Sequence, residues 1–309
     1  MAVHFSFYQL RMKQLLFVSV LFICSLESLS QKTDKKLQSL LEKSIQGFNG
    51  DTGIYVKNLK NGKTIAINAD TTFPTASIVK VPILVGIIDK IENGELNYNQ
   101  ELVYKDSLLY EGVDILGSFK TDEKIVLKKL VMLMLTTSDN TASLWLQSLA
   151  GTGTRINTIL DSLGFSNTRI NSRTPGRENN RTNYGWGQTT PREMGTLFEM
   201  IYLNKLFSFA ASERMMRCLG RNFWDENEAI SQIPPYIEVF SKNGCVNAVR
   251  SEALLVNAPN NPYIFCIFTK NNKDIAWTHD NEAWSLARKI SKQLWDYFEP
   301  KDKWEPAVK

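Results

Sequence analysis

Three short polar motifs in this sequence place hydroxyls, amines and amides where they could perform acyl transfer. In the stretch FPTASIVKVPIL, Ser77 and Lys80 lie three positions apart in an apolar run, which predicts a helix that begins near Ala76 or Ser77 and stops at Asn93-Gly94. Residues three apart share one face of a helix, so the hydroxyl and the amine should be neighbours. Because a desolvated lysine loses its proton more readily than a lysine in water, this pair is a candidate nucleophile and base.

Each motif also has a purely structural interpretation when it is considered alone. Ser77 could cap a helix while Lys80 extends to solvent. The second motif, Ser138-Asp139-Asn140, is ordinary chemistry for the start of a helix. The third motif, Lys242-Asn243-Gly244, is by itself an unremarkable turn after the strand-like YIEVF. The combination of the three motifs, and their order along the chain, therefore has to decide between structure and catalysis.

Histidine and cysteine are too scarce to support other common catalytic chemistries. His279 is the only histidine after the N-terminal segment, and its surroundings, AWTHDNEAW, lack a triad signature. A lysine or a carboxylate is therefore the better candidate for the base of a serine hydrolase. Cys218, Cys245 and Cys266 allow at most one disulfide and have no zinc-type spacing. We expect no metal ion and no organic cofactor.

The composition is that of an ordinary globular protein. The chain has 309 residues, of which 43% are hydrophobic and 22% charged, which suits one large domain or two closely joined ones. The net charge of +4 comes from dispersed lysines and arginines, without the basic and aromatic clusters of a nucleic-acid surface. We expect a monomer that acts on a small molecule and has no nucleic-acid partner.

The N-terminus has the pattern of an export signal. A basic RMK precedes the apolar LLFVSVLFICSL, and small residues at SLS lead into the polar QKTDKK. The apolar core is shorter than the roughly 20 residues that a spanning helix needs. We therefore predict a signal peptide over residues 1–30 and a periplasmic or secreted mature chain from about Gln31. Lipid attachment at Cys24 is the alternative, which Ile23 disfavours.

The order of strand-like and helix-like segments predicts an α/β protein. A helix at about 34–47 precedes two strands, DTGIYVKNL and KTIAINA, which join at Asn61-Gly62 as a hairpin. Residues 75–219 read as mainly helical, and three strands follow, in YIEVFSKNG, EALLVNA and YIFCIFTK. A last amphipathic helix has Trp284, Ala287, Ile290 and Leu294 on one face. We predict an antiparallel sheet flanked by helices, with a split α/β domain of residues 31–72 and 220–309. A mainly helical domain, residues 73–219, is inserted into it and carries the nucleophile.

Together, the three motifs resemble the signatures of class A β-lactamases and penicillin-binding proteins. Ser77 and Ser138 are 61 residues apart, Ser138 and Lys242 are 104 apart, and these separations fit the class A arrangement. The surrounding stretches SDNTAS, TTPREM and VRSEALLV fit it as well. The resemblance covers nearly all of the mature chain and implies a two-lobed class A fold with the active site at the junction of the lobes.

The resemblance implies a catalytic role for residues of the first two motifs. Ser77 would be the acylated nucleophile, and Lys80 would take part in its activation. Ser138 would relay a proton to the leaving nitrogen, and Asn140 would hydrogen-bond the amide side chain of the substrate.

The third motif and the strand after it would bind the substrate. Lys242 would supply positive charge to Ser138 and to a substrate carboxylate. The backbone N–H groups of Ser77 and Cys245 would form the oxyanion hole. Arg250 would be a second anchor for the carboxylate, with Glu252 as its ion-pair partner.

The sequence departs from the pattern of the family at two positions. Asn243 stands where a threonine or serine is usual, so an amide replaces a hydroxyl in substrate binding. The glutamate that activates the hydrolytic water in the family has its slot at Thr174 when the residues are counted back without gaps from TTP. The nearest carboxylate is Glu178, which we name as the candidate displaced base.

The first hypothesis for function is an exported active-site-serine hydrolase that opens β-lactam amide bonds through an acyl-enzyme. The second is a penicillin-binding or peptidase-like enzyme that acts on cell-wall peptides, because the same scaffold serves both. The third is a binding protein that keeps the fold without turnover. The presence of Ser77, Lys80, Ser138, Asn140 and Lys242 together argues against the third hypothesis.

Overall fold

The computed structural model describes residues 32–112 and 115–306. The chain from Thr33 to Lys309 forms one compact unit. The predicted signal peptide and the alternative lipid site at Cys24 lie outside the described residues, and the domain boundaries proposed from the sequence stay a prediction.

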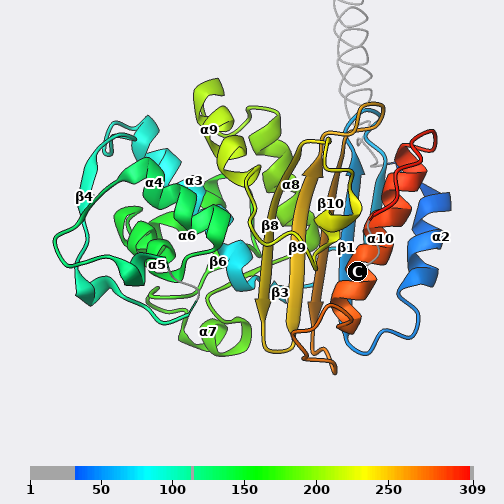
Figure 1. Cartoon of the computed structure of the whole chain (residues 1–309), viewed down its shortest axis with the longest axis horizontal. Coiled ribbons are helices and arrows are strands. Elements are labelled where there is room, and N and C mark those ends of the chain that lie inside the picture. The colour runs from blue at the N-terminus through cyan, green and yellow to red at the C-terminus, as the bar shows by residue number, and fades with distance from the viewer. Residues whose placement is uncertain (1–31, 113–114, 307–309) are drawn as a thin grey trace, which may run out of the picture. The chain divides into compact units, whose positions relative to one another are not determined.

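A five-stranded antiparallel sheet forms the centre of this unit (Figure 1). Its order is β2-β1-β10-β9-β8, so β1, the first strand of the chain, pairs with both β2 and β10, the last strand of the chain. The predicted hairpin is confirmed, because β1 pairs with β2 around the turn at Asn61-Gly62. The bounds are β1 Asp51–Asn58, β2 Thr64–Ile67, β8 Val239–Val246, β9 Val249–Val256 and β10 Tyr263–Lys270.

Helices cover both faces of the sheet. Along β9, Leu254 and Val256 point into a hydrophobic cluster with α10 (Glu282–Phe298) and α2 (Lys35–Ser44). The alternate residues Ala253 and Leu255 join the larger cluster on the other face, as the period of two along a strand requires. That second face packs against α8 (Pro191–Tyr202). The predicted apolar face of the last helix is confirmed, because Trp284, Ala287, Ile290 and Leu294 are all buried.

The mainly helical region lies beside β8, at the left of Figure 1. Its centre is α3, nine of whose residues are buried, so this helix has no solvent-facing side over most of its length. The region also contains a three-stranded sheet, in the order β3-β7-β6, and a two-stranded sheet, β4-β5. The helices are α3 Lys80–Glu92, α4 Leu127–Met132, α5 Asn140–Leu149, α6 Thr152–Ser162, α7 Glu178–Tyr184 and α9 Phe209–Leu219, and the strands are β3 Phe73–Pro74, β4 Glu101–Val103, β5 Lys124–Val126, β6 Arg169–Ile170 and β7 Gly187–Thr189.

The helix predicted from Ser77 begins with a different geometry. Residues Ala76–Val79 form a 3₁₀ turn, η1, and α3 starts only at Lys80. Ala76 has φ of 43°, in the left-handed region that non-glycine residues rarely adopt. The turn keeps the side chains of Ser77 and Lys80 adjacent, because a 3₁₀ turn also brings residues three apart onto one side.

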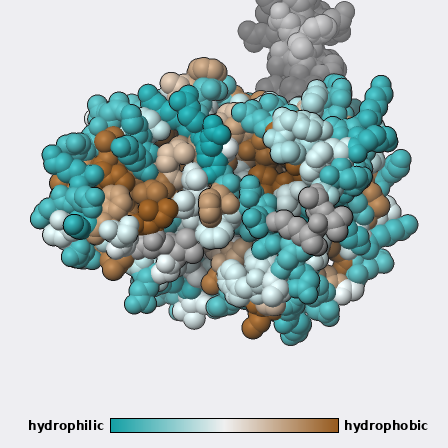
Figure 2. Space-filling view, in the orientation of Figure 1, coloured by the Kyte–Doolittle hydropathy of each residue, from teal (hydrophilic) through white to brown (hydrophobic). Residues whose placement is uncertain are grey.

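The described surface is that of a protein with most of its apolar side chains inside. Figure 2 shows a mainly hydrophilic face interrupted by small separate hydrophobic patches. Within residues 32–112 and 115–306, no helix combines the length and the apolar character that a membrane crossing needs. The three described cysteines, Cys218, Cys245 and Cys266, are free thiols.

Candidate active site

The centre of the site is a contact between Ser77 and Lys80. The Lys80 amine lies 3.0 Å from Ser77 Oγ, and the lysine side chain is fully buried while the serine is partly exposed. Burial lowers the pKa of Lys80 well below its usual range, and the charge of Lys242 lowers it further, against the opposing effect of Asp139. A buried amine that gives up its proton readily therefore lies beside a hydroxyl that a substrate can reach.

The second motif supplies the other partners of the Lys80 amine. Lys80 Nζ is 2.6 Å from Ser138 O, 3.0 Å from Ser138 Oγ and 3.0 Å from Asn140 Oδ1. With Ser77 Oγ this makes four possible acceptors, whereas an ammonium group has only three protons to donate. A neutral amine also makes three hydrogen bonds, two as donor and one as acceptor, and in that form one of the two serine hydroxyls can donate its proton to the nitrogen.

An unusual backbone conformation turns Ser138 toward Lys80. The π-helical turn η4 (Leu133–Thr137) ends at Ser138, whose φ of 62° and ψ of 32° are left-handed. Such strain in a non-glycine residue is typical of functional sites. Asp139 caps α5 by accepting from Ala142 N at 2.7 Å, and its other oxygen accepts from Ile115 N at 2.6 Å. Asp139 therefore fixes the motif rather than taking part in chemistry.

The third motif brings a second buried amine to the site. Lys242 is fully buried, and its Nζ donates to Asn243 O at 2.9 Å and to Asn243 Oδ1 at 3.1 Å. Lys242 and Ser138 share no hydrogen bond, so the expected effect of the lysine charge on Ser138 stays a prediction. Burial lowers the pKa of Lys242 to about 8, although the nearby acids Glu228 and Glu252 oppose the fall.

Gly244 allows strand β8 to approach the nucleophile. A Cβ atom on this residue would lie 2.5 Å from Thr75 O and 2.8 Å from Ser77 N. Only glycine therefore fits between the strand and the turn that carries Ser77. This approach brings the backbone next to Cys245 close to Ser77 N, which is the arrangement that the predicted oxyanion hole requires; the hole itself stays a prediction.

Arg250 is not placed to anchor a substrate carboxylate, which corrects the prediction for this residue. The residue is 2% exposed, and its guanidinium lies against the rings of both Trp277 and Trp284, at 4.6 and 4.7 Å from their centres. Its Nη atoms donate to four backbone carbonyls, those of residues 247, 249, 275 and 276. The expected ion pair with Glu252 is also wrong, because Glu252 instead accepts from Ala229 N and Ile230 N.

Neither Thr174 nor Glu178, the two residues considered for the hydrolytic base, is hydrogen-bonded to Ser77 or Lys80. Thr174, in the slot of the family's glutamate, is buried and donates to Ser172 O at 2.9 Å. Its hydroxyl lies against α6, where a Cβ on Gly153 would be only 1.8 Å from Thr174 Oγ1. Glu178 is exposed at the first turn of α7, and its carboxylate accepts from Gly176 N at 3.1 Å. The prediction that Glu178 replaces the missing base is therefore not supported by its position.

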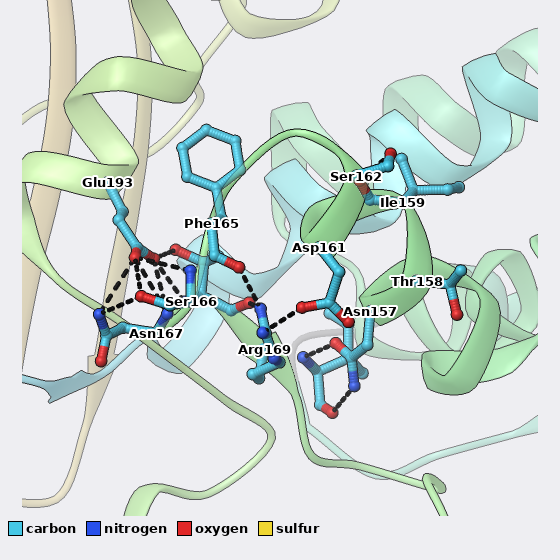
Figure 3. Close-up of polar contacts among 12 residues, drawn as sticks. Asn157, Thr158, Ile159, Asp161, Ser162, Phe165, Ser166, Asn167, Arg169 and Glu193 are labelled. Carbon is cyan, nitrogen blue, oxygen red and sulfur yellow. Dashed lines mark hydrogen bonds and ion pairs between the residues drawn. The ribbon is translucent and has the colours of Figure 1, made fainter.

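The turn that precedes β6 is held firmly in place. Figure 3 shows Glu193, at the start of α8, facing the turn before β6. Its carboxylate accepts from Ser166 N and Asn167 N at 3.0 Å each, and from Thr168 N at 2.6 Å. Burial alone would raise the pKa of Glu193, but hydrogen bonds from Thr168 and Asn167 lower it.

A second set of contacts, also drawn in Figure 3, holds the same turn from the side of α6. Arg169 donates to Phe165 O at 2.7 Å and forms an ion pair with Asp161. Asn157 exchanges two hydrogen bonds with the backbone of Ile170, at 2.8 and 3.0 Å. The strand β6, which leads into the loop that carries Thr174, is therefore held by contacts from both α6 and α8.

Sequence reasoning missed the partner of Asn243. Asn243 Nδ2 donates to Glu228 Oε1 at 2.8 Å, and both side chains are buried. Glu228 lies in DENEAI, a stretch of several acids with no motif, and it is 15 residues from Asn243 in the chain. No spacing rule links the two positions. The only signal was the amide at position 243, which differs from the usual hydroxyl.

No metal centre accompanies the site in the described part of the chain. Within residues 32–112 and 115–306, no group of three or more His, Cys, Asp or Glu side chains could hold a metal ion. The polar groups gathered around Ser77 are two lysines, a serine and an amide. Such groups can activate a nucleophile and stabilise the charges that develop when it attacks an acyl donor.

Comparison with known proteins agrees with this geometry. A sequence model of the β-lactamase enzyme family matches residues 32–298. The β-lactamase VEB-1 of Pseudomonas aeruginosa is 22% identical over 299 residues, which cover 93% of this chain and 98% of the relative. Among solved structures, a leucine-to-glutamate mutant of PBP-A has a TM-score of 0.77 at 24% identity, covering 87% of this chain and 98% of that one. An ancestral class A β-lactamase has a TM-score of 0.74 at 18% identity, covering 85% and 100%. The chain belongs to the β-lactamase enzyme family and is a β-lactamase-like serine hydrolase.

Proposed function

We propose that this protein opens β-lactam amide bonds by forming an acyl-enzyme on Ser77. The observation that supports this most directly is the buried Lys80 amine 3.0 Å from the partly exposed Ser77 hydroxyl. A nucleophile needs an adjacent group to accept its proton, and a desolvated lysine is such a group near neutral pH.

The arrangement accounts for each proton in the acylation step. Lys80 accepts the proton of Ser77 while Oγ attacks the carbonyl carbon of the lactam. The backbone N–H groups of Ser77 and Cys245 stabilise the negative oxygen of the tetrahedral intermediate. A proton then passes through Ser138, which is 3.0 Å from Lys80, to the lactam nitrogen as the C–N bond breaks. The product is an ester on Ser77 and a free amine in the opened ring.

The second candidate is a penicillin-binding or peptidase-like enzyme that acts on cell-wall peptides. It is favoured by the lack of a carboxylate at the hydrolytic position: Thr174 faces α6, and Glu178 is exposed and bonded to Gly176. An enzyme that passes its acyl group to an amine, or keeps it, needs no such base. The PBP-A mutant of similar fold was solved as an acyl-enzyme complex with penicillin-G.

Intact-mass spectrometry over time tests the proposal. Mixing the mature protein with benzylpenicillin should add the mass of one penicillin, and the adduct should be absent in Ser77→Ala. This substitution removes one hydroxyl from a partly exposed side chain, so the fold should persist and circular dichroism can verify it. An adduct that survives in Ser77→Ala would refute the assignment. Loss of the adduct with time would favour the hydrolase over the penicillin-binding candidate.

We also propose that the enzyme acts in the periplasm or outside the cell. The support is the basic, apolar and small-residue pattern of residues 1–30. Expression of the full chain followed by N-terminal sequencing of the exported protein tests this, with a new N-terminus near Gln31 expected. An intracellular product that keeps the first 30 residues would contradict it.

A further inference from the structure

Asn243 joins the buried Lys242 amine to a buried carboxylate. Its Oδ1 accepts from Lys242 Nζ at 3.1 Å, and its Nδ2 donates to Glu228 Oε1 at 2.8 Å. The exposed fractions of Lys242, Asn243 and Glu228 are 0%, 6% and 7%. The lysine fixes the orientation of the amide, because only an oxygen can accept at one end and only an NH₂ group can donate at the other.

An amide suits this position better than a hydroxyl. The carboxamide has its acceptor and its donors on two separate atoms, so it can bond a cation and an anion at the same time. The hydroxyl of a threonine or serine has one oxygen on a shorter side chain, which would have to serve both partners from one point. The departure of residue 243 from the family's pattern is therefore matched by the presence of Glu228 behind it.

Glu228 is itself held in place by its surroundings. Its second oxygen accepts from Asn227 N at 3.0 Å, and the next residue, Ala229, begins the short helix η5 (Ala229–Gln232). Glu252 secures η5 by accepting from Ala229 N at 2.6 Å and Ile230 N at 3.2 Å. Asn243 on β8 lies opposite Glu252 on β9, so both side chains point to the same face of the sheet. Because Asn243 also bonds Glu228, the two acids lie on the same side of β8.

The charges around Lys242 make this contact important for its protonation. Burial raises the pKa of Glu228, and burial together with the charge of Glu228 raises the pKa of Glu252 to about 8. No carboxylate of the described residues forms an ion pair with Lys242. Its amine is linked to the nearest bonded carboxylate, that of Glu228, only through the side-chain amide of Asn243. The titratable groups that face it are Lys80 from α3, Cys245 on β8, Glu252 on β9 and Glu228 before η5.

We propose that Glu228 is a positioning residue that acts on Lys242 through Asn243, keeping the amine charged and aimed at the substrate carboxylate. This role rests on the proposed acylation of Ser77 by substrates that carry a carboxylate. Asn243 transmits the effect because it is the only side chain bonded to both groups in the described structure.

Lysine titration by NMR tests the role without any need for catalysis. Protein labelled with ¹³Cε-lysine gives one signal per lysine, and Lys242→Arg identifies the signal of Lys242. Glu228→Gln keeps the size of the side chain and removes its negative charge, so the pKa of Lys242 should fall by about 0.5 unit or more. Glu238→Gln is the matched control, because Glu238 is an exposed acid just before β8 and does not contact Asn243. The control should leave Lys242 unchanged, and an unchanged Lys242 in Glu228→Gln would overturn the proposal.

The double variant separates transmission through Asn243 from a direct effect of charge. In an Asn243→Ala background, Glu228→Gln should lower the pKa of Lys242 by less than half as much as in the native background. An equal fall in both backgrounds would overturn the role of Asn243.

The rate of acylation by benzylpenicillin should follow the titration. In Glu228→Gln, the decrease of this rate at alkaline pH should move to lower pH by the same amount as the pKa of Lys242. If the pKa of Lys242 falls but the decrease of the rate stays at the same pH, the role in substrate binding is overturned. If Glu228→Gln lowers the pKa of Lys242 but the native protein is never acylated by benzylpenicillin, the proposed function fails, while the effect of Glu228 on Lys242 stands. Should Glu228→Gln not fold, Asn243→Ala alone must lower the pKa of Lys242, and no change would overturn the proposal.

Discussion

Gly244 and Ser77 approach so closely that a methyl group on the glycine would lie 2.8 Å from Ser77 N. Gly244→Ala must therefore move β8 away from η1, and with it the donors expected for the oxyanion hole. Loss of one such donor usually costs about 10²-fold or more in rate, so we expect acylation by penicillin to slow by at least about 10²-fold. Stopped-flow measurement of acylation checks this. Gly220→Ala is the control, because its Cβ would meet atoms only at the ordinary distance of 3.4 Å; an equal loss in both variants would contradict the explanation.

The two buried lysines predict opposite effects of pH on acylation. Lys80 must be neutral to act as a base, so the rate should rise as pH increases through its pKa, which burial has lowered well below the usual range. Lys242 must be charged to attract a carboxylate, so the rate should fall as pH increases through its pKa of about 8. The second-order rate of acylation by benzylpenicillin should therefore be bell-shaped.

A neutral ester substrate is the control for this pH profile. It should keep the rise that belongs to Lys80 and lose most of the fall that belongs to Lys242. A decrease that appears only near the pKa of about 10.4 of an ordinary lysine would show that Lys242 is not perturbed in this way.

Arg250 should contribute to stability rather than to substrate binding. Arg250→Ala removes a cation that contacts the rings of both Trp277 and Trp284, and four carbonyls lose its donors. We expect the free energy of unfolding to fall by about 2–4 kcal/mol, the combined scale of such contacts. Urea denaturation measures this loss. The KM values of anionic and neutral substrates should change by similar factors, and a selective increase of tenfold for the anionic one would restore the predicted role as a carboxylate anchor.

The contacts of Glu193 predict a loss of stability that depends on pH. Glu193→Gln weakens the bonds to Ser166, Asn167 and Thr168, so the free energy of unfolding at pH 7 should fall by about 1–2 kcal/mol. Because the folded protein lowers the pKa of Glu193, the stabilisation is present above the unfolded pKa and disappears as pH falls through the folded pKa. Denaturation curves of the two proteins should therefore converge below about pH 4. A constant difference at all pH values would mean that the charge is unimportant.

Periodicity and local motifs were enough to predict most of the fold. The strands around Ile54, Leu254 and Phe265 and the apolar face of the last helix follow directly from alternating or helical patterns. The hairpin at Asn61-Gly62 follows from turn chemistry. The 3₁₀ geometry at Ser77 was not predicted in this way, and it occurs where strand β8 passes close to the turn, a tertiary contact that local spacing does not reveal.

The site was predictable where its residues are close in sequence or belong to a motif. Ser77, Lys80, Ser138 and Asn140 meet as expected, because the contact of Ser77 with Lys80 is local and the contacts of Lys80 with Ser138 and Asn140 follow from the family resemblance. The environment of Arg250 was not predictable, since Trp277 reaches it from a distant loop. Burial of that guanidinium is a tertiary property that no spacing on β9 reveals.

The loop after β6 leads to the last prediction, which is that neither Thr174 nor Glu178 assists hydrolysis of the acyl-enzyme. Thr174 donates to Ser172 O and packs against Gly153, and a hydroxyl is in any case a very weak base near neutral pH. Glu178 is exposed and bonded to Gly176 N. Release of the ester needs a water that is held and deprotonated beside it, and neither side chain is placed to do this.

With benzylpenicillin we therefore expect a stoichiometric burst and a long-lived adduct on Ser77, with turnover well below the roughly 10 s⁻¹ typical of enzymes. Thr174→Ala and Glu178→Gln should each leave the lifetime of the adduct within about twofold of the native value, because a general base contributes about 10²-fold or more where one acts. Intact-mass spectrometry over hours measures the lifetime. If Glu178→Gln prolongs it tenfold or more, Glu178 reaches the ester in the acylated state and is the displaced base after all. If the native protein hydrolyses penicillin rapidly without accumulating an adduct, another group activates the water and slow deacylation is refuted.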